Sequence, residues 1–77
     1  MPTLVIQFMQ VVPFLVSAAQ DAKPIIDAAK KVIAGWVAGG LISVDIQNQL
    51  HSYLDGLMHA VLAGEVLPEF QVQPDPQ

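Results

Sequence analysis

The stretch from residue 43 to residue 64 reads SVDIQNQLHSYLDGLMHAVLAG, and it carries the clearest helical pattern in the chain. Its apolar side chains recur every three or four residues, which aligns them along one face of an α-helix. They are Ile46, Leu50, Tyr53, Leu54, Leu57, Met58, Val61 and Leu62. Ser43 or Asp45 is suited to cap the N-terminus of this helix, and Gly64 is suited to end it. The pattern predicts an amphipathic helix over about 44–63.

The segment before it shows the same period between a proline and a glycine pair. Pro24 suits the first position of a helix, and Gly39-Gly40 suits its end. The apolar positions between them are Ile25, Ile26, Ala29, Val32, Ile33, Trp36 and Val37. We therefore expect a helix over about 24–38. Because the connection to the helix at 44–63 is short and glycine-rich, the two should form an antiparallel helical hairpin.

The N-terminal segment is apolar almost all round. Residues 1–20 contain no charged side chain. The polar residues recur at helical spacing and form only a thin stripe; they are Thr3, Gln7, Gln10, Ser17 and Gln20. This predicts a helix over about 3–20 that is contacted on most sides, with a kink at Pro13. Sequence alone leaves open whether 3–38 forms two helices or one kinked rod.

The character of the chain changes after Gly64. Residues 65–77 contain Pro68, Pro74 and Pro76, three acidic residues and no basic residue. Such a segment is not helical and is expected to form an extended arm. The chain is thus expected to be all-α, with a helical domain at 1–64 and a C-terminal arm at 65–77. Apolar side chains in the arm predict that it lies against a neighbouring surface, another subunit being favoured; they are Leu67, Phe70 and Val72.

The composition holds the main indication of function. The chain has 77 residues, of which 53% are hydrophobic and 13% charged, against roughly 25% charged in ordinary soluble domains. A domain this small has little interior in which to hide apolar side chains. The surplus of apolar side chains predicts that the chain contacts copies of itself or a larger assembly. The expected interface residues are Leu4, Phe8, Phe14, Trp36, Leu54, Leu57, Met58, Leu67, Phe70 and Val72.

Several classes of function find no support in the residues. There is no cysteine and no glycine-rich phosphate loop, and the few hydroxyls lack a paired base, so we expect no enzyme and no cofactor. His51, Asp55 and His59 are each four residues apart, but the outer two lie about 12 Å apart on a helix and cannot share one zinc ion. We therefore expect no metal site. Three lysines and a net charge of −4 argue against nucleic-acid binding.

Three readings of function remain, and one is favoured. It is a non-catalytic structural or interaction protein, a homo-oligomer or a subunit of a larger assembly such as a phage or viral component, located in a virion or the cytoplasm. The first alternative is a small membrane protein of the holin or virion-peptide kind, because residues 3–20 would span about 27 Å as a helix. Gln7, Gln10 and Pro13 argue against it. The second alternative is a small soluble helical adaptor that binds a partner helix in a groove.

Overall fold

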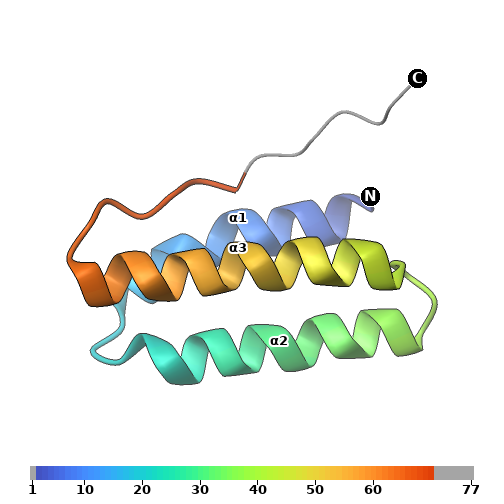
Figure 1. The fold of residues 1–77 in the computed structure, drawn as a ribbon. Helices are drawn as coiled ribbons and strands as arrows, with labels where there is room; N and C mark the ends of the chain where they lie inside the picture. Colours follow the sequence, from blue (N-terminus) through green and yellow to red (C-terminus); the bar gives the residue numbers. More distant parts are fainter. Residues whose placement is uncertain (1, 71–77) are drawn as a thin grey trace.

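Three α-helices account for most of the chain. The computed structural model describes residues 2–70, in which α1 is Thr3–Ala18, α2 is Ala22–Ala38 and α3 is Val44–Ala63. These described residues contain no strand, which confirms the predicted all-α fold. The helices alternate in direction, so that α2 runs antiparallel to both α1 and α3 (Figure 1).

The junction between α1 and α2 differs from the prediction at both ends. Helix α1 ends at Ala18 rather than near residue 20, and α2 begins at Ala22 rather than at Pro24. The physical reason is a side-chain cap, because the Asp21 carboxylate accepts a hydrogen bond from the Lys23 backbone N–H at 3.1 Å. Pro24 then falls in the first helical turn, where no backbone N–H finds an intrahelical partner, so its missing donor is tolerated.

Residues 3–38 are therefore two helices and not one kinked rod. Pro13 does not divide α1, which continues through it as one helix.

The turn between α2 and α3 is closed by backbone geometry that glycine supplies. Gly40 has a φ of 76°, in the left-handed region. Its N–H donates to the Val37 carbonyl at 3.0 Å, and the Leu41 N–H donates to the Trp36 carbonyl at 2.8 Å. This is the Schellman pattern that ends many helices.

The next helix starts at once. The Ser43 hydroxyl caps α3 by accepting from the Ile46 N–H at 3.2 Å, while Asp45 lies inside the first turn. Helices α2 and α3 thus pack as an antiparallel pair joined by a short turn.

One stripe of each helix forms the core. The described chain buries no polar side chain in it. Its completely enclosed residues come from all three helices; the largest are Met9, Ile33, Leu50, Leu54, Leu57, Val5 and Val12. Burying each of these side chains contributes about 1.5–3 kcal/mol, so the packed stripes are what hold the short helices together.

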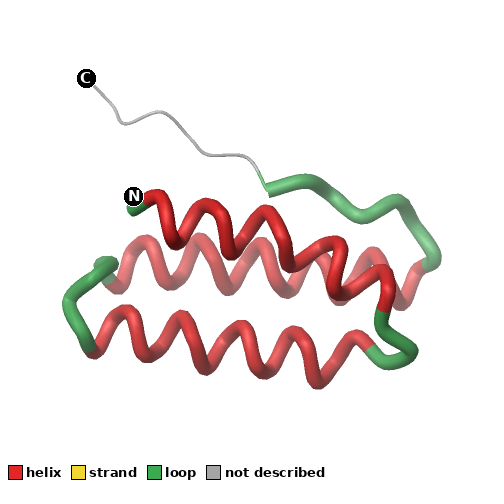
Figure 2. Tube along the Cα trace, turned by 180° about the vertical axis from the view of Figure 1, so that it is seen from behind, coloured by secondary structure: helices red, strands yellow, loops and turns green. Residues whose placement is uncertain are grey.

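The C-terminal segment folds back over the helices. Gly64 has a φ of 70°, and the following Glu65 N–H donates to the Ala60 carbonyl at 2.9 Å, which turns the chain out of α3. Residues 65–70 then return in an extended conformation on the side where α1 and α3 lie (Figures 1 and 2). Residues 71–77, with Val72 and the last two prolines of the predicted arm, lie outside the described part of the chain.

Candidate interaction surfaces

Helix α1 carries a second apolar stripe beside the one that it buries. Leu4, Phe8, Val11 and Leu15 follow the spacing i, i+4, i+7, i+11, which places them on one side of the helix. Leu4 is 61% exposed, Val11 50% and Leu15 48%. Only Phe8 is covered in part. A long exposed apolar stripe of this kind is what remains when a helix has a partner on one side only.

A matching stripe on α2 lies beside it. Ile25, Val32 and Trp36 are spaced by seven and four residues. The rings of Phe8 and Trp36 meet edge to face, with centroids 5.1 Å apart and planes at 85°, and this contact places the two stripes side by side. We call the combined surface the apolar face; it consists of Leu4, Phe8, Val11, Leu15, Ile25, Val32 and Trp36.

No charged side chain belongs to the apolar face. Helix α1 has none along its whole length. On α2, Lys30 turns toward α3, where its ammonium group contacts the Asp55 carboxylate at 2.8 Å. Lys23, Asp27 and Lys31 lie at least about 100° around the helix from Val32. The apolar face therefore offers hydrophobic and van der Waals contact and has no titratable group with which to transfer a proton.

A groove between α1 and the C-terminal segment forms a second surface. It has a volume of about 600 Å³. Its lining residues are Gln10, Pro13, Phe14 and Ser17 of α1 together with Val66, Leu67, Glu69 and Phe70. Phe14 is 74% exposed, so the returning segment covers this side of α1 incompletely.

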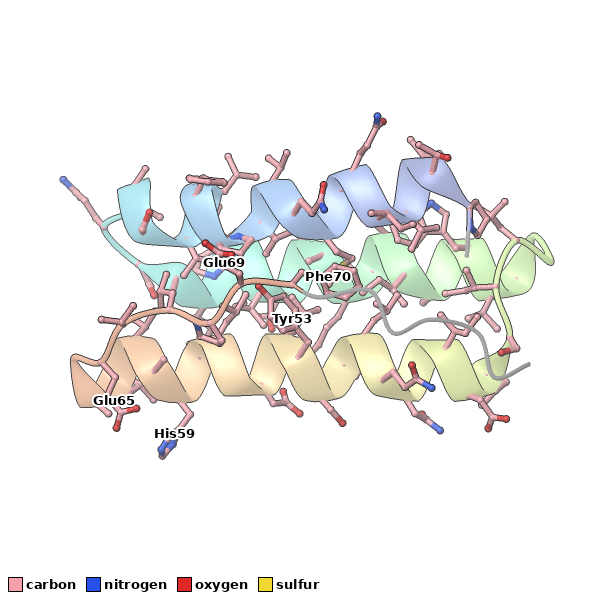
Figure 3. All side chains as sticks on the ribbon, turned by 90° about the horizontal axis from the view of Figure 1, so that it is seen from above. Tyr53, His59, Glu65, Glu69 and Phe70 are labelled. Atoms are coloured by element: carbon pink, nitrogen blue, oxygen red, sulfur yellow. The ribbon has the colours of Figure 1, made fainter. Side chains whose placement is uncertain are left out.

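Tyr53 of α3 holds the returning segment in place. Its hydroxyl donates a hydrogen bond to the Pro68 carbonyl at 2.8 Å, and its ring meets that of Phe70 edge to face at 5.2 Å. Figure 3 shows the segment passing between α1 and α3 with Phe70 beside Tyr53. Burial, and secondly the nearby Glu69 carboxylate, raise the pKa of Tyr53 to about 12, which keeps the hydroxyl protonated as a donor.

The predicted interface residues that the structure describes fall into four groups. Leu4, Phe8 and Trp36 belong to the apolar face, and Phe14 lines the groove. Leu54 and Leu57 are fully buried among the chain's own helices, and Met58 packs against that core.

Leu67 and Phe70 of the C-terminal segment form the fourth group. Leu67 and Phe70 are partly buried against the core of the same chain. The prediction that they anchor the arm on another subunit stays a prediction, and Val72 lies outside the described residues.

The predicted interface did not include Val11, Leu15, Ile25 and Val32, which complete the apolar face. A signal was present in the spacing, since α1 and α2 each carry more apolar positions than one core-facing stripe needs. What sequence could not supply is which stripe faces the core. The ion pair of Lys30 with Asp55 joins residues 25 apart in the chain, so no local spacing indicates it.

The three residues weighed as metal ligands have separate surroundings. Asp55 pairs with Lys30, and His59 extends away from the helices (Figure 3). His51 is partly buried, and its Nε2 atom has no hydrogen-bond partner in the structure. Within residues 2–70, no group of three His, Cys, Asp or Glu side chains is placed to hold a metal ion.

The fold defines the class of this protein as a three-helix bundle with an exposed, uncharged apolar face. In the part of the chain that the structure describes, no helix has both the length and the apolar character needed to cross a membrane. Comparisons with protein-family models, with curated proteins and with solved structures found no match.

Proposed function

We propose that this chain is a non-catalytic interaction protein that packs into a larger protein assembly through its apolar face. The observation that carries the proposal is the exposed, charge-free surface that α1 and α2 form together. Soluble monomers rarely expose a continuous apolar patch without using it.

The energetics of covering the face support a binding role. Leu4, Val11, Leu15 and Val32 each keep between 40% and 61% of their surface exposed. Full burial of such a side chain is worth about 1.5–3 kcal/mol, so covering what remains is worth about 1 kcal/mol for each. Covering these four side chains on each of two matching faces would then contribute about 8 kcal/mol. This gain is similar in size to the cost of association, which is about 4–15 kcal/mol. The face is therefore suited to reversible contacts or to repeated contacts in an assembly.

A ring, a tube or a virion shell is a setting in which many small helical subunits meet in this way. The viral setting stays a prediction from size and composition.

Site-specific photo-crosslinking tests the proposal without assuming a partner. A diazirine amino acid is placed at Leu15 on the apolar face or, as the control, at Asn48 on the exposed side of α3, in the cells that make the protein. We expect a discrete protein adduct from position 15 and none from position 48. Equal labelling at both positions, or none at position 15, would contradict the proposal.

A further inference from the structure

We infer that the apolar face is occupied by a second copy of this chain, with the α1–α2 face of one copy packed on the α1–α2 face of the other about a two-fold axis. This inference rests on the proposed function and names its partner.

Charge favours a second copy over other occupants. The chain has a net charge of −4, yet every charged residue of α2 lies off the apolar face and α1 has none. A partner surface with charged groups would lose their hydration against this face without compensation. An anionic lipid surface is drawn by clusters of Lys and Arg, which the face lacks. The same face on a second copy is also uncharged, because the two chains are identical. A two-fold axis brings identical surfaces of two copies together.

The dimensions of the face suit a small dimer. Helix α1 has 16 residues and α2 has 17, so a surface two helices wide measures about 24 Å by 20 Å, or about 480 Å² in projection. Pairing two such faces removes about 1,000 Å² in all, which is at the lower bound for a specific interface. The α1 stripe has spacings of four, three and four residues, and the α2 stripe has spacings of seven and four. Both are also found in helices that pack side by side in four-helix bundles.

Gly35 marks where the second copy would approach most closely. It lies near the C-terminal end of α2, directly before Trp36 and three residues after Val32. A Cβ atom added at Gly35 would meet nothing within 4 Å in the chain. Glycine inside a helix lowers its stability relative to alanine, and nothing within the chain requires it here. A bare backbone at this point lets a neighbouring helix come close.

Sedimentation velocity of the purified chain and two glycine variants tests the inference. Gly35→Leu places a bulky side chain beside the face, and Gly56→Leu is the matched control, because Gly56 is also helical, exposed and open at Cβ but lies on α3. Both variants should keep the helix content of the parent, since neither added Cβ meets an obstacle. We expect the parent and Gly56→Leu to dimerise between about 20 µM and 1 mM. We expect Gly35→Leu to dimerise at least about tenfold more weakly.

Three outcomes would overturn the inference. The first is a parent chain that stays monomeric up to about 1 mM, and the second is a Gly35→Leu variant that dimerises as well as the parent. The third is a monomer that floats with phosphatidylcholine vesicles, because lipid would then be the occupant. If the parent is monomeric and position 15 crosslinks to a different protein, the inference of a second copy is overturned and the proposed function stands. A monomeric parent with no face-specific crosslink would overturn both.

Discussion

Tyr53 is the residue that connects the returning C-terminal segment to the helices, through one hydrogen bond to Pro68 and one ring contact with Phe70. Tyr53→Phe removes the hydrogen bond and keeps the ring. We expect the free energy of unfolding in urea at pH 7 to fall by about 0.5–1.5 kcal/mol, the net value of one such bond. An unchanged free energy of unfolding would mean that water replaces the bond without loss.

The same tyrosine gives stability a pH dependence with a defined sign. Its pKa is about 12 in the folded chain against 10.0 for an unperturbed tyrosine. The folded state therefore holds the phenol proton more tightly, and the stability gained is complete below pH 10 and is lost as pH rises toward 12. The difference in unfolding free energy between the parent and Tyr53→Phe should shrink across that window. A difference that stays constant from pH 9 to pH 12 would contradict the burial of this hydroxyl.

Two leucines of α3 provide a matched test of which side faces the core. Leu54 is fully buried, whereas Leu62 is 80% exposed. Leu54→Ala should lower the free energy of unfolding by about 2–5 kcal/mol because it leaves a cavity. Leu62→Ala should change it by less than about 0.5 kcal/mol. Similar losses at the two positions, measured by urea unfolding, would show that α3 is rotated relative to this structure.

At the scale of the helices, replacing glycine by alanine should lower stability at two positions and raise it at two others. Gly40 and Gly64 have positive φ angles and end α2 and α3, so Gly40→Ala and Gly64→Ala should each destabilise the chain by about 1–2 kcal/mol. Gly35 and Gly56 lie within helices with open space at Cβ. Gly35→Ala and Gly56→Ala should each stabilise the monomer by about 0.5–1 kcal/mol. Thermal unfolding of the four variants, at concentrations below those at which the chain associates, checks the signs.

Removing residues 65–77 tests how far the C-terminal segment stabilises the helices. Leu67 and Phe70 are partly buried against the core, so their loss together with the Tyr53 hydrogen bond should lower the free energy of unfolding by about 2–3 kcal/mol. Helix content in the far-UV spectrum should stay the same, because α3 already ends before the segment.

The control for the truncation is Val66→Ala, which changes a side chain that is almost fully exposed and should have no measurable effect. A truncated chain as stable as the parent would show that the segment contributes nothing to the bundle.

The helix over 44–63 and its hairpin with the preceding helix could be predicted from sequence, because both helices have an apolar period between clear end signals. Whether 3–38 forms two helices or one kinked rod could not be predicted. Local chemistry predicts Ser43 or Asp45 as the cap of α3 and Gly64 as its end, and the structure shows Ser43 and Gly64 in these positions. The start of α2 was misplaced because the Asp21 side-chain cap competed with the preference of Pro24 for the first helical position. The apolar face could not be assigned, since the burial of Phe8 against Trp36 depends on how two helices pack.

For the whole molecule, association is expected because the helices carry more apolar surface than their shared core buries. Each helix buries one stripe in the shared core, and α3 balances its stripe with a polar side. Helix α1 has no charged residue on any side, so part of the apolar surplus inferred from composition lies on the face that it forms with α2. Phe14, Leu62 and Val66 are exposed elsewhere. Because that face is uncharged, association through it should not weaken as salt is raised, since no attraction between charges is there to be screened.

The most direct test of the apolar face as the interaction surface is a dilution series followed by methyl NMR. Between about 20 µM and 1 mM, we expect concentration-dependent shifts at Leu4, Val11, Leu15 and Val32. The methyl groups of Leu54 and Leu57, which are enclosed in the core, should stay constant. Shifts confined to Val66 and Leu67 beside the groove, or no shift at any methyl group over this range, would contradict the account.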